Sequence, residues 1–185
     1  MPILAAEPSI YPERLLDNLD EVSVDRSWWA VYTRARQEKA LARQLFAQQV
    51  PFYLPLVARE SLVRGRRVRS FVPLFGGYLF LLGTESERVK CLATNRVAQI
   101  LPVPDTAQLA GDLKNVQQLI LADAPLTIER QLKPGRKVRV KAGSLLGLEG
   151  TVITQRGKSK LVVAVQMLQQ GVSMEIENFL LEPLA

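Results

Sequence analysis

Residues 73–82 have the sequence PLFGGYLFLL, which predicts a tight turn followed by a buried β-strand. Glycine adopts backbone conformations that other residues avoid, so the pair Gly76-Gly77 favours a turn. The run that begins at Tyr78 is apolar at every position, which is typical of a central strand buried on both faces. This stretch therefore indicates the middle of a sheet, with aromatic rings close to the turn.

The segments on either side alternate between predicted strands and helices. Residues 28–33 are rich in aromatic and β-branched side chains and predict a strand, and apolar residues recur at helical spacing between Arg36 and Gln49. Further strands are expected at residues 52–57, 68–72 and 97–103, and further helices at residues 85–92 and from about residue 105. Thr84 and Glu87 predict a capping box. The order predicts a compact α+β domain.

The pattern changes after residue 121. Residues 122–131 contain a proline and show no clear period, which is typical of a linker. Short β-branched runs separated by glycines follow at residues 137–141, 150–154, 161–165 and 172–176, and their spacing predicts a small β-barrel. We therefore expect four parts: an acidic flexible tail (1–26), the α+β domain (27–121), a linker (122–131) and the β-barrel (132–185).

Composition excludes several classes of protein. The chain has 185 residues, 48% hydrophobic and 23% charged, which is the balance of a folded protein. It has no histidine and one cysteine, which excludes a Cys/His zinc site, a Ser-His-Asp or Cys-His nucleophile and an intrachain disulfide. Glu85 and Glu87 lie two apart and would not share a helix face. We expect no catalytic residue, metal or cofactor.

Charge is distributed unevenly along the chain. Residues 1–27 carry six acids and two bases, a net charge of −4, whereas the remaining residues carry 22 bases and 12 acids, a net charge of +10. A positive body favours polyanions such as nucleic acids. The acidic segment is expected to shield that basic surface. No run approaches the roughly 18 to 20 apolar residues that cross a bilayer, so we expect a cytoplasmic monomer.

Motifs in both halves of the chain resemble one family. The sequences KPGRKVRVKAG at residues 133–143 and GLEGTV at residues 147–152 look like a KOW motif. WWAVYT at residues 28–33, Glu38-Lys39 and PLFGGYLF at residues 73–80 resemble the N-terminal domain of NusG. Together these matches span roughly residues 27–184, so the chain resembles the NusG family of transcription elongation factors. The resemblance implies an antiparallel sheet flanked by helices in the first domain, followed by a small SH3-like β-barrel. Residues 27–29, 62–67 and 73–80 resemble the specialised paralogue RfaH more than housekeeping NusG.

The resemblance implies that the N-terminal domain binds the clamp helices of RNA polymerase and suppresses pausing or termination, with no catalysis. The matching residues for this surface are Phe75, Tyr78 and Phe80. Aromatic side chains suit the role because they dominate protein interfaces. The alternative is that members of this run, especially Leu79 and Leu81, are plain core. Gly76 stands where most relatives have proline.

The resemblance also implies contact with the non-template DNA strand of the transcription bubble. The matching residues are Arg34, Arg36, Arg43, Thr94, Asn95 and Arg96. The alternative is an ordinary solvated helix face with Glu38 as a counter-charge. A second basic cluster occupies the predicted hairpin after residue 57, where it either contacts DNA, RNA or polymerase or simply solubilises the tip. Its members are Arg59, Arg64, Arg66, Arg67 and Arg69.

In relatives the KOW domain recruits the NusE ribosomal protein or the termination factor Rho. Met167 and Leu168 match that position, with burial in the core as the alternative. RfaH can hold this domain as a helical hairpin, but the β-branched runs and glycines of this chain favour strands. The alternative function is a ribosome-associated or RNA-binding KOW protein that grips structured RNA.

Overall fold

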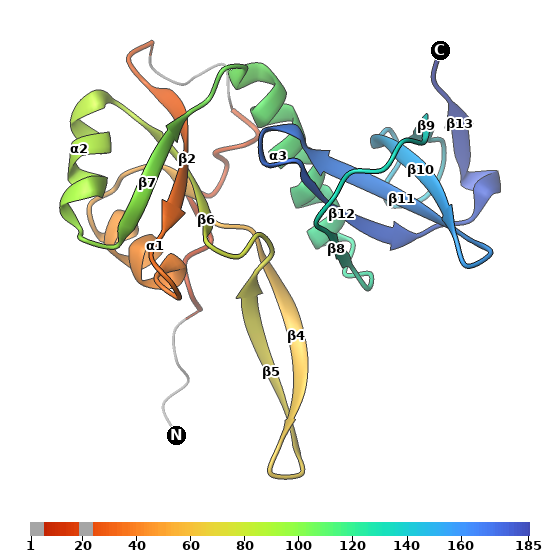
Figure 1. The fold of residues 1–185 in the computed structure, drawn as a ribbon, viewed down its shortest axis with the longest axis horizontal. Coiled ribbons are helices and arrows are strands. Elements are labelled where there is room, and N and C mark those ends of the chain that lie inside the picture. The colour runs from red at the N-terminus through yellow and green to blue at the C-terminus, as the bar shows by residue number, and fades with distance from the viewer. Residues whose placement is uncertain (1–5, 19–23) are drawn as a thin grey trace. The chain divides into compact units, whose positions relative to one another are not determined.

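The computed structural model describes residues 6–18 and 24–185, which fold into two compact units, residues 1–106 and 107–185 (Figure 1). Each unit has a sheet of its own. Across the described residues, no helix combines the length and the apolar character needed to span a bilayer.

The described part of the first unit contains strands and two helices. In chain order these are β1 (Ile10–Tyr11), β2 (Ser27–Thr33), α1 (Glu38–Ala47), β3 (Phe52–Tyr53), β4 (Leu56–Val63), β5 (Arg66–Pro73), β6 (Tyr78–Gly83), α2 (Glu85–Ala93) and β7 (Val97–Pro102). Five strands form an antiparallel sheet in the order β1-β3-β6-β2-β7, and β4 and β5 form a separate hairpin. The predicted strand over residues 52–57 is divided at Leu54-Pro55, because proline has no N–H to donate to a ladder.

The core of the first unit lies between the sheet and its two helices. Leu41 and Leu45 of α1 and Cys91 of α2 pack in one cluster with Val31, Leu79 and Leu81 of the sheet. Side chains alternate between the faces of a strand, so the neighbouring residues of β6 point the other way. These are also buried, which confirms that β6 is a central strand covered on both faces.

Residues 6–18 pack on the first unit, so the prediction of a flexible tail is wrong for them. β1 pairs with β3, and Leu15 and Leu16 are buried. The rings of Tyr11 and Phe46 meet edge to face with centroids 5.5 Å apart. Burial of these apolar groups offsets the entropy that ordering the segment costs. Residues 1–5 and 19–23 of the predicted tail lie outside the described residues.

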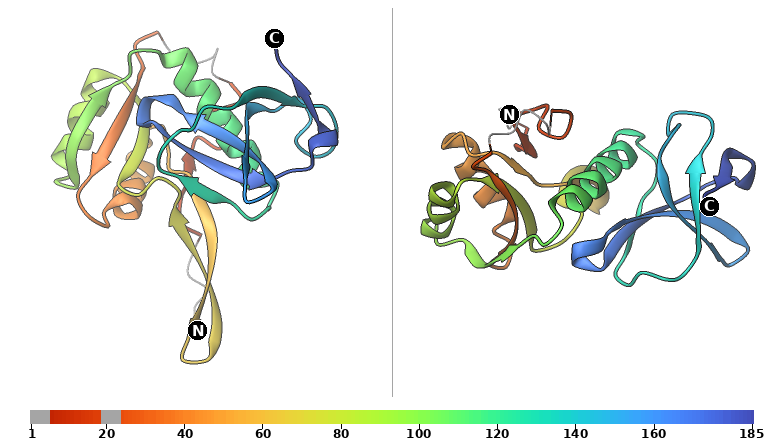
Figure 2. Two further views of the ribbon diagram at one scale, coloured as in Figure 1. Left: turned by 45° about the vertical axis from the view of Figure 1, so that its right-hand side comes forward. Right: turned by 90° about the horizontal axis from the view of Figure 1, so that it is seen from above.

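The hairpin of β4 and β5 extends away from the five-stranded sheet of its unit (Figures 1 and 2). Its pairing runs from Leu56 opposite Pro73 to Val63 opposite Arg66. The two turn residues, Arg64 and Gly65, have φ values of 50° and 76°. Positive φ at both central positions is the geometry of a tight two-residue hairpin turn, which confirms the predicted turn.

The second unit contains one long helix and a six-stranded antiparallel sheet. Its elements are α3 (Thr106–Leu121), β8 (Thr127–Glu129), β9 (Arg136–Val140), β10 (Glu149–Gln155), β11 (Lys158–Val165), η2 (Gln166–Leu168), β12 (Gln170–Glu175), η3 (Asn178–Leu180) and β13 (Leu181–Pro183). The strand order is β13-β9-β10-β11-β12-β8. The predicted strands are confirmed, and this part of the chain is not a helical hairpin. The pairing leaves β13 and β8 as the two ends of the sheet, so a closed barrel is not shown.

The predicted linker is part of the second unit. β8 lies within residues 122–131 and pairs with β12, with Ile128 opposite Val172. The Ser173 hydroxyl, which is buried, donates a hydrogen bond of 2.6 Å to Glu129 Oε1. The prediction of a free linker is therefore wrong for Thr127–Glu129, because their backbone is paired with β12. The compact units also divide before α3, at residues 106 and 107, and not after residue 121.

Candidate functional site

Two tyrosines form an aromatic pair at the surface of the first unit. Tyr32 at the end of β2 lies opposite Tyr78 at the start of β6, with ring centroids 5.2 Å apart. Tyr32 is 44% exposed and Tyr78 is half-buried. Sequence reasoning named Tyr78 but missed Tyr32, because only the register of the two strands brings the second ring to the first.

The other two predicted rings are not accessible. Phe75 and Phe80 have 1% and 0% of their surfaces exposed. Phe80 belongs to the central strand, whose two faces are both covered, and this is the physical reason for its burial. The surface expected from Phe75, Tyr78 and Phe80 is therefore corrected to one built on Tyr78 and Tyr32.

Gly77 connects the tyrosine pair to the first helix. Its carbonyl oxygen accepts hydrogen bonds from Thr33 N at 2.8 Å and Thr33 Oγ1 at 3.3 Å, and its N–H donates to Glu38 Oε1 at 2.8 Å. Gly77 has a φ of 85°, and a Cβ at this position would lie 2.9 Å from Tyr32 Cε2. A side chain would strain the backbone and displace the ring, so the turn requires glycine. Glu38, expected as a surface counter-charge, instead anchors this turn.

The backbone brings together two of the predicted nucleic-acid segments that are distant in sequence. Arg34 N donates a hydrogen bond of 2.8 Å to Arg96 O, so the loop before α1 lies against the turn before β7. Arg36 and Asn95 both have a φ of 61°, which gives each loop a sharp reversal. Arg34, Arg36 and Asn95 are exposed. Exposed guanidinium and amide groups in one place can contact phosphate and base edges.

The remaining members of the predicted nucleic-acid set already have partners. Arg96 is half-buried and its guanidinium donates to Gln37 Oε1 and Gln44 Oε1, both on or beside α1. The Thr94 hydroxyl donates to Cys91 O at 2.7 Å and accepts from Arg96 N at 3.3 Å. These contacts hold the turn in place, so their role in the structure is to position the exposed groups beside them.

Arg43 is paired with an acidic residue of the N-terminal segment. Its Nη1 lies 2.7 Å and 2.8 Å from the two carboxylate oxygens of Glu7. The segment that carries Glu7 is held on the unit by β1, so the acid is presented to α1 by the fold. Arg43 therefore meets a carboxylate where a phosphate was expected.

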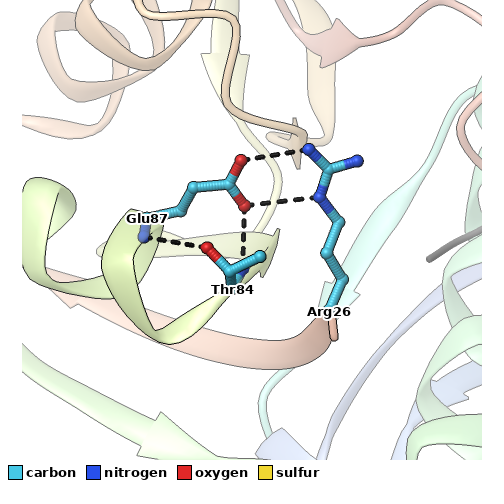
Figure 3. Close-up of polar contacts among 3 residues, drawn as sticks. All are labelled: Arg26, Thr84 and Glu87. Atoms are coloured by element: carbon cyan, nitrogen blue, oxygen red, sulfur yellow. Dashed lines mark hydrogen bonds and ion pairs between the residues drawn. The ribbon is translucent and has the colours of Figure 1, made fainter. Parts of the chain in front are cut away.

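The first turn of α2 is held by contacts of Glu87 and Arg88. The Thr84 hydroxyl accepts from Glu87 N, and Glu87 Oε2 accepts from Thr84 N at 2.7 Å, which confirms the predicted capping box (Figure 3). Arg26 Nη2 lies 3.0 Å from Glu87 Oε1. Arg88 pairs with Glu85, and its guanidinium lies 5.5 Å from the Trp29 ring centroid.

The ionisation of Glu87 reflects this network. Partial burial alone would raise the pKa of its carboxyl group. Hydrogen bonds from Arg26 and from Thr84 N, together with the charges of Arg26 and Lys90, outweigh burial and hold the pKa below its ordinary value. Glu87 is therefore a charged residue at neutral pH that fixes the start of α2 against the segment before β2.

The residues predicted to bind a partner in the second unit lie in a turn that is hydrogen-bonded to α3. Met167 and Leu168 lie in η2 and are both half-buried. Gln166 N donates a hydrogen bond of 3.0 Å to Asp112 Oδ2, and Asp112 is itself buried in α3 and accepts from Gln108 Nε2. The turn therefore presents part of each apolar side chain from a fixed backbone.

A separate groove lies on the same unit and was not predicted. It has a volume of about 670 Å³ and is lined by apolar side chains that include Leu145, Met174 and Ile176. The ion pair between Lys158 and Glu175 lies at its lining. Its residues come from β9, β11, β12 and the segments that follow β9 and β12, so no local sequence pattern could have indicated it.

The cysteine of this chain is not a reactive thiol. Cys91 is buried, and burial raises the pKa of its thiol to about 12, so it stays protonated at neutral pH. Among the residues that the structure describes, no three His, Cys, Asp or Glu side chains are grouped to hold a metal ion. The first unit places a pair of tyrosines next to the exposed residues Arg34, Arg36 and Asn95. We call the two adjoining segments that carry these three residues the basic loop.

A model of the family described as transcription termination factor nusG matches residues 26–120, just over half of the chain. The chain belongs to the NusG family. NusG proteins are transcription factors and not enzymes. A chain in the crystal structure of an MjSpt4:Spt5 complex is also similar, at 17% sequence identity and a TM-score of 0.28 over 85% of this chain and 97% of that one. The family match continues through most of α3, beyond the point where the compact units divide.

Proposed function

We propose that this NusG-family chain is a transcription elongation and antitermination factor that binds RNA polymerase through Tyr32 and Tyr78. The observation that carries the proposal is the Gly77 turn, which joins these tyrosines to the basic loop through three hydrogen bonds. Tyrosine is enriched at the energetic centres of protein interfaces because its ring gives a large contact area for few rotatable bonds. The partner surface is the polymerase clamp helices.

The basic loop, made of the segment with Arg34 and Arg36 and the adjoining turn with Asn95, contacts the non-template DNA strand. It lies beside the tyrosine pair, since Thr33 is bonded to Gly77 and Arg34 to Arg96. A polymerase held by the tyrosines would thus bring its displaced strand to the arginines. Arginine binds phosphate with two parallel hydrogen bonds and also stacks on unpaired bases.

The second unit is a KOW domain of SH3-like type, and it recruits a partner through Met167 and Leu168. The NusE ribosomal protein and Rho are the candidates, and the fixed turn made by η2 supports a preformed contact. The factor acts in the cytoplasm as a specialised, RfaH-like paralogue. Its second unit remains a sheet and does not switch to a helical hairpin.

A pull-down with purified RNA polymerase tests the main proposal. Tyr78→Ala and Tyr32→Ala are each expected to lower polymerase affinity about tenfold or more, since central aromatic residues contribute about 2 kcal/mol or more. Leu146→Ala is the matched control, because Leu146 is an apolar residue of the second unit with 66% of its surface exposed. Tyr78→Phe keeps the ring and is expected to bind nearly as well as the wild type.

Transcription in vitro supplies the functional readout. The wild-type chain is expected to shorten pause lifetimes and raise readthrough at Rho-dependent sites, and the Tyr78→Ala variant to do neither. Retention of ribosomal RNA that depends on arginines and salt, together with polymerase affinity unchanged by both tyrosine substitutions, would overturn the proposal in favour of an RNA-binding KOW protein.

A further inference from the structure

The hairpin of β4 and β5 is a two-stranded ribbon rich in arginine. It contains none of the residues of the tyrosine pair or the basic loop. Cross-strand register divides its side chains between two faces, because residues directly opposite each other share a face. One face carries Glu60 opposite Arg69 and Leu62 opposite Arg67. The other carries Arg59 opposite Ser70, Ser61 opposite Val68 and Val63 opposite Arg66. We call this second set, together with the turn residue Arg64, the Arg59 face.

The Arg59 face combines positive charge with exposed apolar side chains. It contains three arginines and no acid, and Arg59, Arg64 and Arg66 are all exposed. Within residues 6–18 and 24–185, no ion pair involves any of these three guanidinium groups. Val63 and Val68 lie among them with 51% and 42% of their surfaces exposed. Exposed valines do not increase solubility, so their presence among the arginines at the end of the hairpin indicates a binding surface.

The arginines are confined to the outer part of the ribbon. The three cross-strand pairs nearest the sheet, from Leu56 opposite Pro73 to Ala58 opposite Phe71, contain none. At about 3.4 Å per residue, the five outer pairs extend roughly 17 Å beyond them. Two strands about 4.8 Å apart fit with their side chains into the B-DNA major groove, which is about 12 Å wide. The major groove of A-form RNA is too narrow and deep to admit such a ribbon.

We propose that the Arg59 face is a binding site for double-stranded DNA that enters the major groove. Arg59, Arg64 and Arg66 neutralise phosphates, the exposed Ser61 hydroxyl reaches polar base edges, and the valines contact thymine methyl groups. The Ser70 hydroxyl is not counted, because it donates a hydrogen bond of 3.4 Å to Arg59 O. The site goes beyond the single-strand contact of the basic loop, because it uses other residues and another form of DNA. It requires no polymerase, so its failure would leave the proposed function untouched.

Fluorescence anisotropy with the full chain tests the site. The probes are a labelled 20-base-pair DNA duplex, one of its single strands and the double-stranded RNA of the same sequence. The triple variant R59Q/R64Q/R66Q is expected to lose at least tenfold in duplex affinity. The slope of log affinity against log salt concentration is expected to be shallower by about 2 to 3 in this variant, because each phosphate contact contributes about 0.9 to the slope.

The matched control is K133Q/R136Q/K137Q, which removes the same charge from three exposed residues of the second unit. It is expected to change duplex affinity less than twofold. Equal losses in the two triple variants would overturn the proposal in favour of general electrostatic attraction. Binding of the RNA duplex as tight as that of the DNA duplex would overturn it as well. So would unchanged DNA affinity in R59Q/R64Q/R66Q, provided that its thermal unfolding matches the wild type.

Discussion

Substitution of the two adjacent glycines of the PLFGGYLF turn should have opposite effects. Gly77 has a φ of 85°, and an added Cβ would lie 2.9 Å from Tyr32 Cε2. The left-handed conformation costs alanine about 1 to 2 kcal/mol, and disturbing the tyrosine pair costs about 0.5 to 1.5 kcal/mol more. We therefore expect Gly77→Ala to lower the free energy of unfolding by about 2 kcal/mol.

Gly76→Ala is the matched control. A Cβ at Gly76 would meet no atom within 4 Å, and its φ lies outside the left-handed region. Alanine restricts the unfolded chain more than glycine does, so this variant is expected to be neutral or more stable by up to about 1 kcal/mol. The two variants should differ by roughly 10 °C in unfolding temperature, given about 4 to 8 °C per kcal/mol for a unit of this size.

Tryptophan fluorescence of the whole chain is the appropriate assay. The two tryptophans, Trp28 and Trp29, are neighbours in β2, so the signal reports the first unit alone. Urea titrations at fixed temperature give the difference in free energy between the variants. If Gly77→Ala unfolds within 0.5 kcal/mol of the wild type, the turn does not need glycine and the reasoning about its geometry is wrong.

Three further predictions concern polar contacts. The pKa of Glu87 in the folded protein lies below its unfolded value, so ionised Glu87 stabilises the fold fully above about pH 5 and less as pH falls through the folded pKa. Glu87→Gln should lower the free energy of unfolding by about 1 kcal/mol at pH 7. In urea titrations at several pH values, the variant should also lose less stability on acidification than the wild type. Glu7→Gln removes the carboxylate from Arg43 and should raise affinity for single-stranded DNA in anisotropy at low salt, whereas Glu13→Gln, with the same charge change, should not reproduce the full increase. Asp112→Ala removes the hydrogen bond between the η2 turn and α3, so it should speed amide hydrogen exchange at Gln166 by tenfold or more. Unchanged exchange would show that Asp112 does not hold this turn in place.

Much of the first unit could be predicted because its long elements carry strong local patterns. The helix around Leu41 and Leu45 has helical spacing, and the strand from Tyr78 has an unbroken apolar run. The capping box is a local signal that needs only Thr84 and Glu87, three residues apart. These features depend on near neighbours in sequence, so the chain itself displays them.

The short strands could not be predicted for the opposite reason. β1, β8 and β13 have two or three residues each, too few to show a period. Their pairing depends on partners 40 or so residues away, such as Tyr53 for Ile10 and Val172 for Ile128. The expectations of a free tail and a free linker were wrong because they rested on the absence of a local pattern.

The candidate site shows the same limit. The aromatic residues near Gly77 are visible in the sequence, but exposure depends on what covers each face of β6. Phe80 and Tyr78 lie two apart on one face, yet the first is fully buried and the second is not. The partners of Arg43 and Arg96 lie 36 and more than 50 residues away, which no pattern of charges could reveal.

The pairing of β1 with β3 also has a practical consequence for anyone who shortens the protein. β3 lies next to the margin of its sheet, and Ile10 and Tyr11 occupy the hydrogen-bonding positions beyond it. A truncation that begins at Ser27 would leave the N–H and C=O groups of β3 open to strands from other molecules. Such a fragment should self-associate at high concentration, and its behaviour would be a poor guide to the whole chain.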